Sequence, residues 1–245
     1  QELYAAEAPE GVRLVTLGID VQNGAEGEGG HVEFSAWGWG QGEEAWLLGH
    51  WIWRDPPLVD ARAWVRLENF ILDRRFKGET GQDHPIAAVC IDSGGARFTQ
   101  KVYEFAHRMR SRRVWAIKGR SGNKSGERSG AIWPRDPSRT SSGFLLHLVD
   151  VDMAKDELNK KLTYGVRDGA PVHFPFNPAD GSTDIDREFF ERLTKEKPLA
   201  VPGRPGAVKW QEKATGNEPW DTFVYAYAAT HGLRMLKGGS KIAAW

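Results

Sequence analysis

Two uninterrupted apolar segments each end in a single acidic residue. Residues 14–22 carry Asp20 near their far end, and residues 86–95 carry Asp92 just before Ser-Gly-Gly. Apolar runs of this length, bounded by glycine and polar residues, are typical of strands covered on both faces of a sheet. An ionised carboxylate at a buried strand end needs a cation or a hydrogen-bonding partner, so the pair indicates a shared metal site. Either acid alone is better explained as a strand-end residue that caps backbone amides.

Between these segments the pattern predicts an antiparallel meander. Residues 31–40 alternate as a strand, Gln41-Gly42 is a two-residue turn signal, and residues 43–53 resume an apolar, aromatic run. We expect the tryptophans of this hairpin to pack across the strands rather than to stack on nucleic-acid bases. They are Trp37, Trp39, Trp46, Trp51 and Trp53.

Apolar residues at helical spacing predict the covering helices. Residues 60–75 and 99–109 form amphipathic stripes, with Asp60 as the N-cap of the first. Further helices are expected at 152–162, with Asp152 in the N-cap position, and at 184–196. Short strands are expected at 114–117, 144–151, 172–175 and 207–213.

The last element is a helix that begins at Asn217. Pro219 suits its first turn, and alanine and aromatic residues repeat at helical spacing up to His231. Glu218 and Asp221 lie three apart on one face of the first turn, where the helix dipole favours negative charge. A helix packed on the sheet could point such a carboxylate at the strand ends, although helix-end electrostatics explains each acid taken alone.

Two segments concentrate positive charge. The predicted helix at 99–109 and the residues after it carry Lys101, Arg108, Arg110, Arg112 and Arg113. A Gly/Ser-rich segment from 118 to 143 carries Lys118, Arg120, Lys124, Arg128, Arg135 and Arg139. A loop of this length is typically functional or disordered. The pattern therefore leaves phosphate binding and a solvated insertion equally open.

The composition is that of an ordinary globular domain, and it does not by itself indicate a function. The chain has 245 residues, 40% of them hydrophobic and 27% charged, with a net charge of zero. We expect a soluble domain with no membrane segment, since no apolar run reaches the roughly 18 residues needed to cross a bilayer. The single cysteine, Cys90, excludes an internal disulfide and is expected to be a buried hydrophobe. Residues 1–10, polar and alanine-rich, are expected to be a linker.

The order of elements predicts an α/β protein of the ribonuclease H-like class, in which helices flank a mixed sheet made of an antiparallel meander and parallel strands. In this layout, acids from the first strand, a later strand and the terminal helix can meet. Oxygen ligands of this kind suit Mg²⁺ or Mn²⁺ in two-metal phosphodiester cleavage. His-Glu-x-x-His, Walker and Gly-x-Ser-x-Gly motifs do not occur in the sequence, so metalloprotease, nucleotide-hydrolase and serine-hydrolase classes each lack their main element.

Several short segments, in order along the chain, resemble the C-terminal nuclease domain of the phage terminase large subunit, from the lambda-like DNA-packaging family. They are Gly18-Ile-Asp20-Val-Gln22, Trp37-Gly-Trp-Gly40, Gly42-Glu43-Glu44, Asp92-Ser-Gly-Gly95, Ile117-Lys-Gly119, Asp152-Met-Ala-Lys155, Val172-His-Phe-Pro175, Asn217-Glu218 and Asp221-Thr-Phe-Val-Tyr-Ala226.

The resemblance implies an endonuclease that cuts concatemeric double-stranded DNA. It assigns Asp20, Asp92 and Asp221 to metal binding, gives Lys118 a role in steadying a phosphate, and leaves Glu218 as a ligand, a nearby base or a cap. The two basic segments supply the candidate DNA-binding residues, which are Arg108, Arg112, Arg120, Lys124, Arg128, Arg135 and Arg139. The implied partners are an ATPase domain preceding the nuclease domain at 11–245, the terminase small subunit and the portal protein, in the host cytoplasm. No nucleotide cofactor is expected in this part.

Two alternatives stay open from the sequence. One is a ribonuclease H-like module that binds DNA or a portal protein without catalysis. The other is a transposase or junction-resolving nuclease on the same fold. All three acids are present, which speaks against the first, and the terminase-like segments extend beyond the shared core, which speaks against the second.

Overall fold

The computed structural model describes residues 1–25, 27–95, 97–120, 130–203, 208–211 and 216–236. In this part of the chain, a nine-stranded sheet has the order β7-β8-β6-β5-β1-β2-β3-β9, with β4 paired to β5. Strands β1 to β3 form the expected antiparallel meander, whereas β5, β6 and β8 add in parallel. The strands are β1 (Leu14–Gln22), β2 (His31–Trp39), β3 (Ala45–Trp53), β4 (Arg75–Lys77), β5 (Asp83–Asp92), β6 (Val114–Arg120), β7 (Ser138–Arg139), β8 (Leu145–Asp150) and β9 (Val172–His173).

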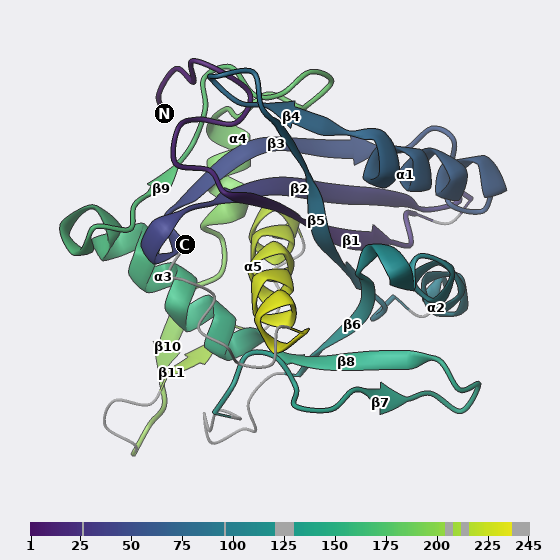
Figure 1. Cartoon of the computed structure of the whole chain (residues 1–245). Helices are drawn as coiled ribbons and strands as arrows, with labels where there is room; N and C mark the ends of the chain where they lie inside the picture. The colour runs from purple at the N-terminus through teal and green to yellow at the C-terminus, as the bar shows by residue number, and fades with distance from the viewer. Residues whose placement is uncertain (26, 96, 121–129, 204–207, 212–215, 237–245) are drawn as a thin grey trace.

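Helices cover both faces of this sheet, as predicted for a mixed α/β protein. Helices α1 (Ala61–Asp73) and α2 (Thr99–Arg108) pack on one face. The other face carries α3 (Val151–Asp168), α4 (Arg187–Leu193) and α5 (Glu218–Leu236), and Figure 1 shows α5 running across the central strands. A separate ribbon pairs β10 (Pro198–Ala200) with β11 (Val208–Trp210). Within the described ranges, no helix has the length and apolar character that a membrane span requires.

Each face of the sheet carries its own hydrophobic core, and alternate side chains of β1 point into one core or the other. Val15, Leu17 and Ile19 belong to the core beneath α1 and α2. On the opposite face, the Thr16 hydroxyl donates to the Ala226 carbonyl of α5, 2.8 Å away. Asp20 has the same parity as Thr16, so it emerges on the α5 face.

Gly18 allows α5 to lie directly on β1. A Cβ built at this glycine would stand 1.9 Å from the Thr222 carbonyl oxygen and 2.6 Å from the Ala226 nitrogen. Every turn of α5 buries residues, so the helix is covered almost all round, as its continuous apolar sequence requires. Trp37 of β2 stacks on Phe223 of this helix with ring centroids 3.7 Å apart, so it packs against α5 and not across the hairpin. The predicted cross-strand packing is present at Trp51 of β3, which stacks on Phe34 of β2 with centroids 5.2 Å apart.

At the element ends and in the core, the structure confirms two local predictions and contradicts two others. Asp60 caps α1 by accepting from the Arg62 amide, and Cys90 is buried, both as predicted. The prediction that Asp152 is an N-cap was wrong: Asp150 caps α3 by accepting from the Met153 amide, because β8 runs straight into the helix. The hairpin also needs more than two turn residues, since a short 3-10 turn, η1 (Gln41–Glu43), separates β2 from β3.

The segment expected to be a linker lies against the sheet. The Glu2 amide donates to the Phe174 carbonyl, and the Ala8 amide donates to the Lys77 carbonyl at 2.9 Å. Tyr4 and Ala8 are buried in the core on the α1 side. Residues 1–8 therefore contribute to the packing of the domain.

We predict that Gly18→Ala destabilises the domain by on the order of 3 kcal/mol, because the new methyl group would overlap helix backbone that cannot rotate away. Chemical denaturation measures the loss. The matched control is Gly119→Ala, whose Cβ would meet only the Val151 side chain, at 3.1 Å. Equal stability of the two variants would contradict the close packing of α5 on β1.

Candidate active site

The sheet brings Asp20 and Asp92 to one place. Strands β1 and β5 are parallel neighbours with Gly18 opposite Cys90 and Ile19 opposite Ile91, so the next step places Asp20 beside Asp92. Both carboxylates are on the α5 face, and their residues are only 5% and 8% exposed. The Gln22 side chain donates to Asp20, and the Gly94 amide donates to Asp92 at 3.0 Å. The predicted pairing of the two strand ends is thus present.

The first turn of α5 adds Asp221 to this pair. Asp221 is 6% exposed and precedes Thr222, the residue whose carbonyl contacts Gly18. Tyr225, one turn further along, is fully buried: burial raises the pKa of its phenol well above the usual value, and the charges of Asp92, Asp221, Asp20 and Glu196 raise it further. The three acids predicted from the sequence are therefore near enough for their charges to act on one buried tyrosine, and Glu196, which was not predicted, acts on it as well.

A cavity of about 290 Å³ opens beside these acids. Asp92 and Asp221 line it together with Lys118, which lies two residues before the end of β6. The ribbon β10–β11 closes one side with Lys209 and Trp210, whose indole donates to Asp156 of α3 at 2.8 Å. The remaining charged lining comes from three residues that had no predicted site role: Asp152, Lys155 and Glu196.

Lys155 and Glu196 form a buried network with Asp221. The Lys155 ammonium pairs with Glu196 and lies 3.6 Å from Asp221 Oδ1. Asn217 Nδ2 donates to Glu196 Oε1 at 2.7 Å and to Asp221 Oδ2 at 3.1 Å. For Lys155, a signal was available: it follows Asp152 by three residues in a predicted helix, a spacing that places the two side chains on one face. For Glu196, which lies after the end of α4, the sequence offers no such signal.

Glu218 is directed to a different network. Its carboxylate accepts from Arg192 of α4 at 2.7 Å, and the same guanidinium donates to both oxygens of Glu33, at 2.6 and 2.8 Å. His50 Nε2 lies 2.9 Å from Glu33 Oε1. Burial alone would raise the pKa of Glu33, but hydrogen bonds and charge from His50 and Arg192 outweigh it and lower that pKa. Glu218 thus anchors the first turn of α5 to α4 and β2.

The donor chemistry of the acid cluster fits a hard divalent cation. Asp20, Asp92 and Asp221 supply only carboxylate oxygens, which are the ligands that Mg²⁺ and Mn²⁺ prefer. Among the residues that the structure describes, no three His, Cys, Asp or Glu side chains already converge as a metal-binding group. The acids are adjacent, but their oxygens are engaged with protein groups such as Gln22, Asn217 and Lys155.

The predicted DNA-binding arginines have varied surroundings. Arg108 pairs with Glu68 of α1 at 2.8 Å, and Arg139 donates to the Gly143 carbonyl. Arg112 lies exposed in a 3-10 turn, η2 (Arg110–Arg112), and Arg120 ends β6, two residues beyond Lys118. Lys124 and Arg128 lie outside the described residues. Of this set, Arg120 is nearest in sequence to a residue of the acid-lined cavity.

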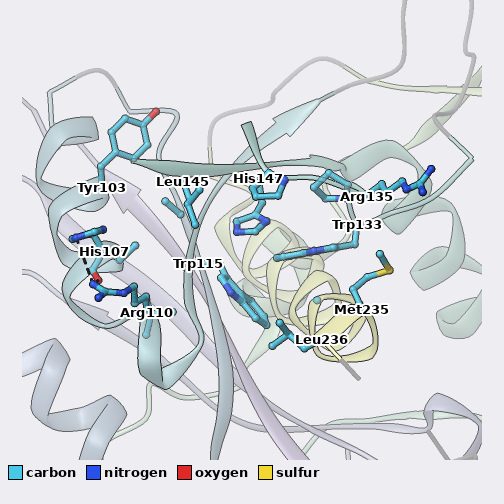
Figure 2. A pocket seen from close by; sticks show the side chains of 16 residues that line it. Tyr103, His107, Arg110, Trp115, Trp133, Arg135, Leu145, His147, Met235 and Leu236 are labelled. Atoms are coloured by element: carbon cyan, nitrogen blue, oxygen red, sulfur yellow. Dashed lines mark hydrogen bonds between the residues drawn. The ribbon is translucent and has the colours of Figure 1, made fainter. Parts of the chain in front are cut away.

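Arg135 lines a second, larger cavity of about 440 Å³, which Figure 2 shows. Its walls are mainly apolar and aromatic. Trp115 comes from β6, His147 from β8, Trp133 from the segment between these strands, and Leu236 from the last turn of α5. Burial lowers the pKa of His147 to about 4, so the imidazole is neutral at physiological pH. The acid cluster is at the first turn of α5 and this cavity is at its last, so the two sites are separate.

A mixed sheet that brings acids from its first strand, a parallel neighbour and a covering helix together is compatible with the ribonuclease H-like class. Residues 1–239 match the family described as terminase large subunit gpA, endonuclease domain. The chain belongs to this family. No solved structure shows a significant match.

Two phage proteins are similar over most of the chain. The terminase large subunit of Escherichia phage lambda is 33% identical over 241 residues, which cover 94% of this chain and 34% of the relative. The terminase large subunit of Enterobacteria phage P21 is 27% identical over 239 residues, which cover 92% and 33%. The chain therefore spans about a third of the length of these relatives.

We predict that Arg192→Met lowers the free energy of unfolding by about 3 kcal/mol at neutral pH, because it leaves the buried Glu33 carboxylate without its guanidinium. The lowered pKa of Glu33 in the folded protein means that its stabilisation is present above the ordinary carboxyl pKa of about 4.3 and is lost on acidification below it. The difference between wild type and variant should therefore shrink toward low pH.

Denaturation curves across pH measure this difference. The matched control is Arg187→Met on the same helix, where the ion pair with Glu191 is exposed and little change is expected. A pH-independent loss in Arg192→Met would contradict the charge-based explanation.

Proposed function

We propose that this domain cuts double-stranded DNA by metal-dependent phosphodiester hydrolysis, with Asp20, Asp92 and Asp221 as the metal ligands. The observation that carries the proposal is the position of these three buried acids in a chain of an endonuclease family: Asp20 and Asp92 stand at adjacent strand ends, and Asp92 and Asp221 line one cavity. Family membership also favours this function over a transposase or junction-resolving nuclease. A non-catalytic binding module has no use for a buried acid cluster that costs desolvation energy.

The chain's own residues have distinct tasks in this proposal. Asp20 and Asp92 extend from adjacent strands of the sheet, so their separation is fixed by the hydrogen-bonded register. Divalent ions, when bound, would activate a water and stabilise the leaving oxygen. Lys118, at the mouth of the cavity, holds a phosphate of the bound strand. Glu218 positions the helix through Arg192 and does not bind metal.

The wider role follows from the relatives. In this proposal the domain cuts concatemeric DNA during packaging, in the host cytoplasm, as part of a longer chain with an ATPase domain. The terminase small subunit and the portal protein would be its partners. Both relatives are terminase large subunits, and each extends well beyond the matched third.

We predict that the purified domain nicks plasmid DNA with Mg²⁺ or Mn²⁺ and stops when a chelator is added. Asp92→Asn should reduce cutting by on the order of a hundredfold or more, because it removes one ligand charge at a fixed strand end. The matched control is Asp73→Asn at the exposed end of α1, which should cut as wild type. Circular dichroism checks that both variants fold. Undiminished cutting by Asp92→Asn would end the site assignment.

The basic segment gives a separate prediction. If Arg120, Lys124 and Arg128 neutralise phosphates, replacing all three by Ala should lower the slope of log affinity against log salt by about 0.9 for each phosphate that is no longer neutralised. Fluorescence anisotropy with a DNA duplex measures the slope. Arg187→Ala, on the exposed side of α4, serves as the control. An unchanged slope in the triple variant would show that this segment is a solvated insertion that does not bind phosphate.

A further inference from the structure

Lys155 places a buried positive charge among the acids. Its side chain is 9% exposed, and its ammonium lies between the carboxylates of Glu196 and Asp221, which are 2% and 9% exposed. A buried ammonium is stable only beside opposite charge, and clustered carboxylates repel one another without a cation. Lys155 therefore supplies the positive charge that this part of the cluster needs in the absence of metal.

Each oxygen of the carboxylates on either side of Lys155 already faces a protein group. Asp221 directs Oδ1 toward the ammonium and Oδ2 toward Asn217. Glu196 likewise directs Oε2 to the ammonium and Oε1 to Asn217, at 2.7 Å. A divalent cation that binds Asp221 therefore coordinates an oxygen that already faces Lys155 or Asn217, and its charge is opposed by the nearby ammonium.

The two contacts of Lys155 differ in strength. The contact with Glu196 is a hydrogen-bonded ion pair, whereas the 3.6 Å separation from Asp221 is too long for a hydrogen bond and is held by charge alone. Asp221 is thus the partner that the lysine gives up more readily. Glu196, further held by Asn217, is the partner that keeps the lysine in place.

We infer that Lys155 is a built-in counter-cation that competes with divalent metal for Asp221, and that Glu196 is its anchor and not a metal ligand. The inference rests on the proposed function because it takes Asp221 as a metal ligand. It makes Lys155 a positioning residue that keeps the acids together before metal binds and sets how tightly metal is held.

Isothermal titration of the DNA-free domain with Mn²⁺ tests the competition. Lys155→Met keeps the length of the side chain and removes the charge, so Mn²⁺ should bind on the order of tenfold more tightly. The matched control is Lys160→Met, on the same helix, where the lysine pairs with Glu157 at the exposed surface. This control should bind Mn²⁺ as wild type does. Unchanged or weaker binding by Lys155→Met would overturn the inference.

The role of Glu196 is tested in the Lys155→Met background. With no lysine left to anchor, Glu196→Gln should weaken Mn²⁺ binding only about threefold, by loss of a nearby charge. Asp221→Asn in the same background should weaken it by about a hundredfold, since a ligand is lost. Equal losses in the two variants would make Glu196 a ligand and contradict the anchor role.

The outcomes separate this inference from the proposed function. If Lys155→Met alone does not fold, the double variant Lys155→Met/Glu196→Gln removes both charges of the buried pair and restores neutrality. It should bind Mn²⁺ at least as tightly as wild type, and tenfold weaker binding would overturn the inference. Mn²⁺ binding that is lost in Asp92→Asn but unchanged in Lys155→Met would preserve the proposed metal site and reject the competition. A folded wild type that binds no Mn²⁺ would reject both.

Discussion

The direct contact between the backbone of α5 and strand β1 determines where the functional groups lie. At Gly18 there is no side chain, so the helix sits on the strand itself, and Thr16 fixes it further along by bonding the Ala226 carbonyl. The helix cannot slide or tilt at this contact without a clash. Its first turn is therefore delivered to the carboxyl ends of β1 and β5, and Asp221 meets acids that are distant in sequence. The geometry of the cluster is a consequence of sheet parity and one glycine.

Two buried ionic networks hold the first turn of α5 from opposite sides. Asp221 faces Lys155, Asn217 and Glu196, while Glu218, three residues earlier, faces Arg192 and Glu33. The two acids looked equivalent in sequence, but each has a cation of its own. Buried ion pairs add little net stability once desolvation is counted, yet breaking one is costly. Such networks therefore specify position, and here they fix the orientation of the turn that carries Asp221.

Much of the fold and part of the site could be predicted from the pattern of the sequence. The apolar runs ending in Asp20 and Asp92 predicted two buried strands, because continuous apolar runs suit a sheet covered on both faces, and the structure places these strands side by side. The cap of α3 was misplaced, because a strand that passes directly into a helix leaves no loop to mark the boundary. Lys155 and Glu196 escaped prediction for a different reason. Their place in the site depends on the contact between Lys155 of α3 and Glu196, which is 41 residues further along the chain. No local periodicity encodes a contact over such a separation.

The length of chain between β1 and α5 has a consequence for biosynthesis. Thr16 and Ala226, which bond to each other, are 210 residues apart, so β1 leaves the ribosome long before its covering helix exists. Contacts of such high sequence separation form late and slowly. Until α5 is made, the strip of the central sheet beneath it stays open to water, and Asp221 is not yet beside Asp20 and Asp92. The acid cluster is therefore assembled among the last steps of folding, after nearly all of the described chain has been translated.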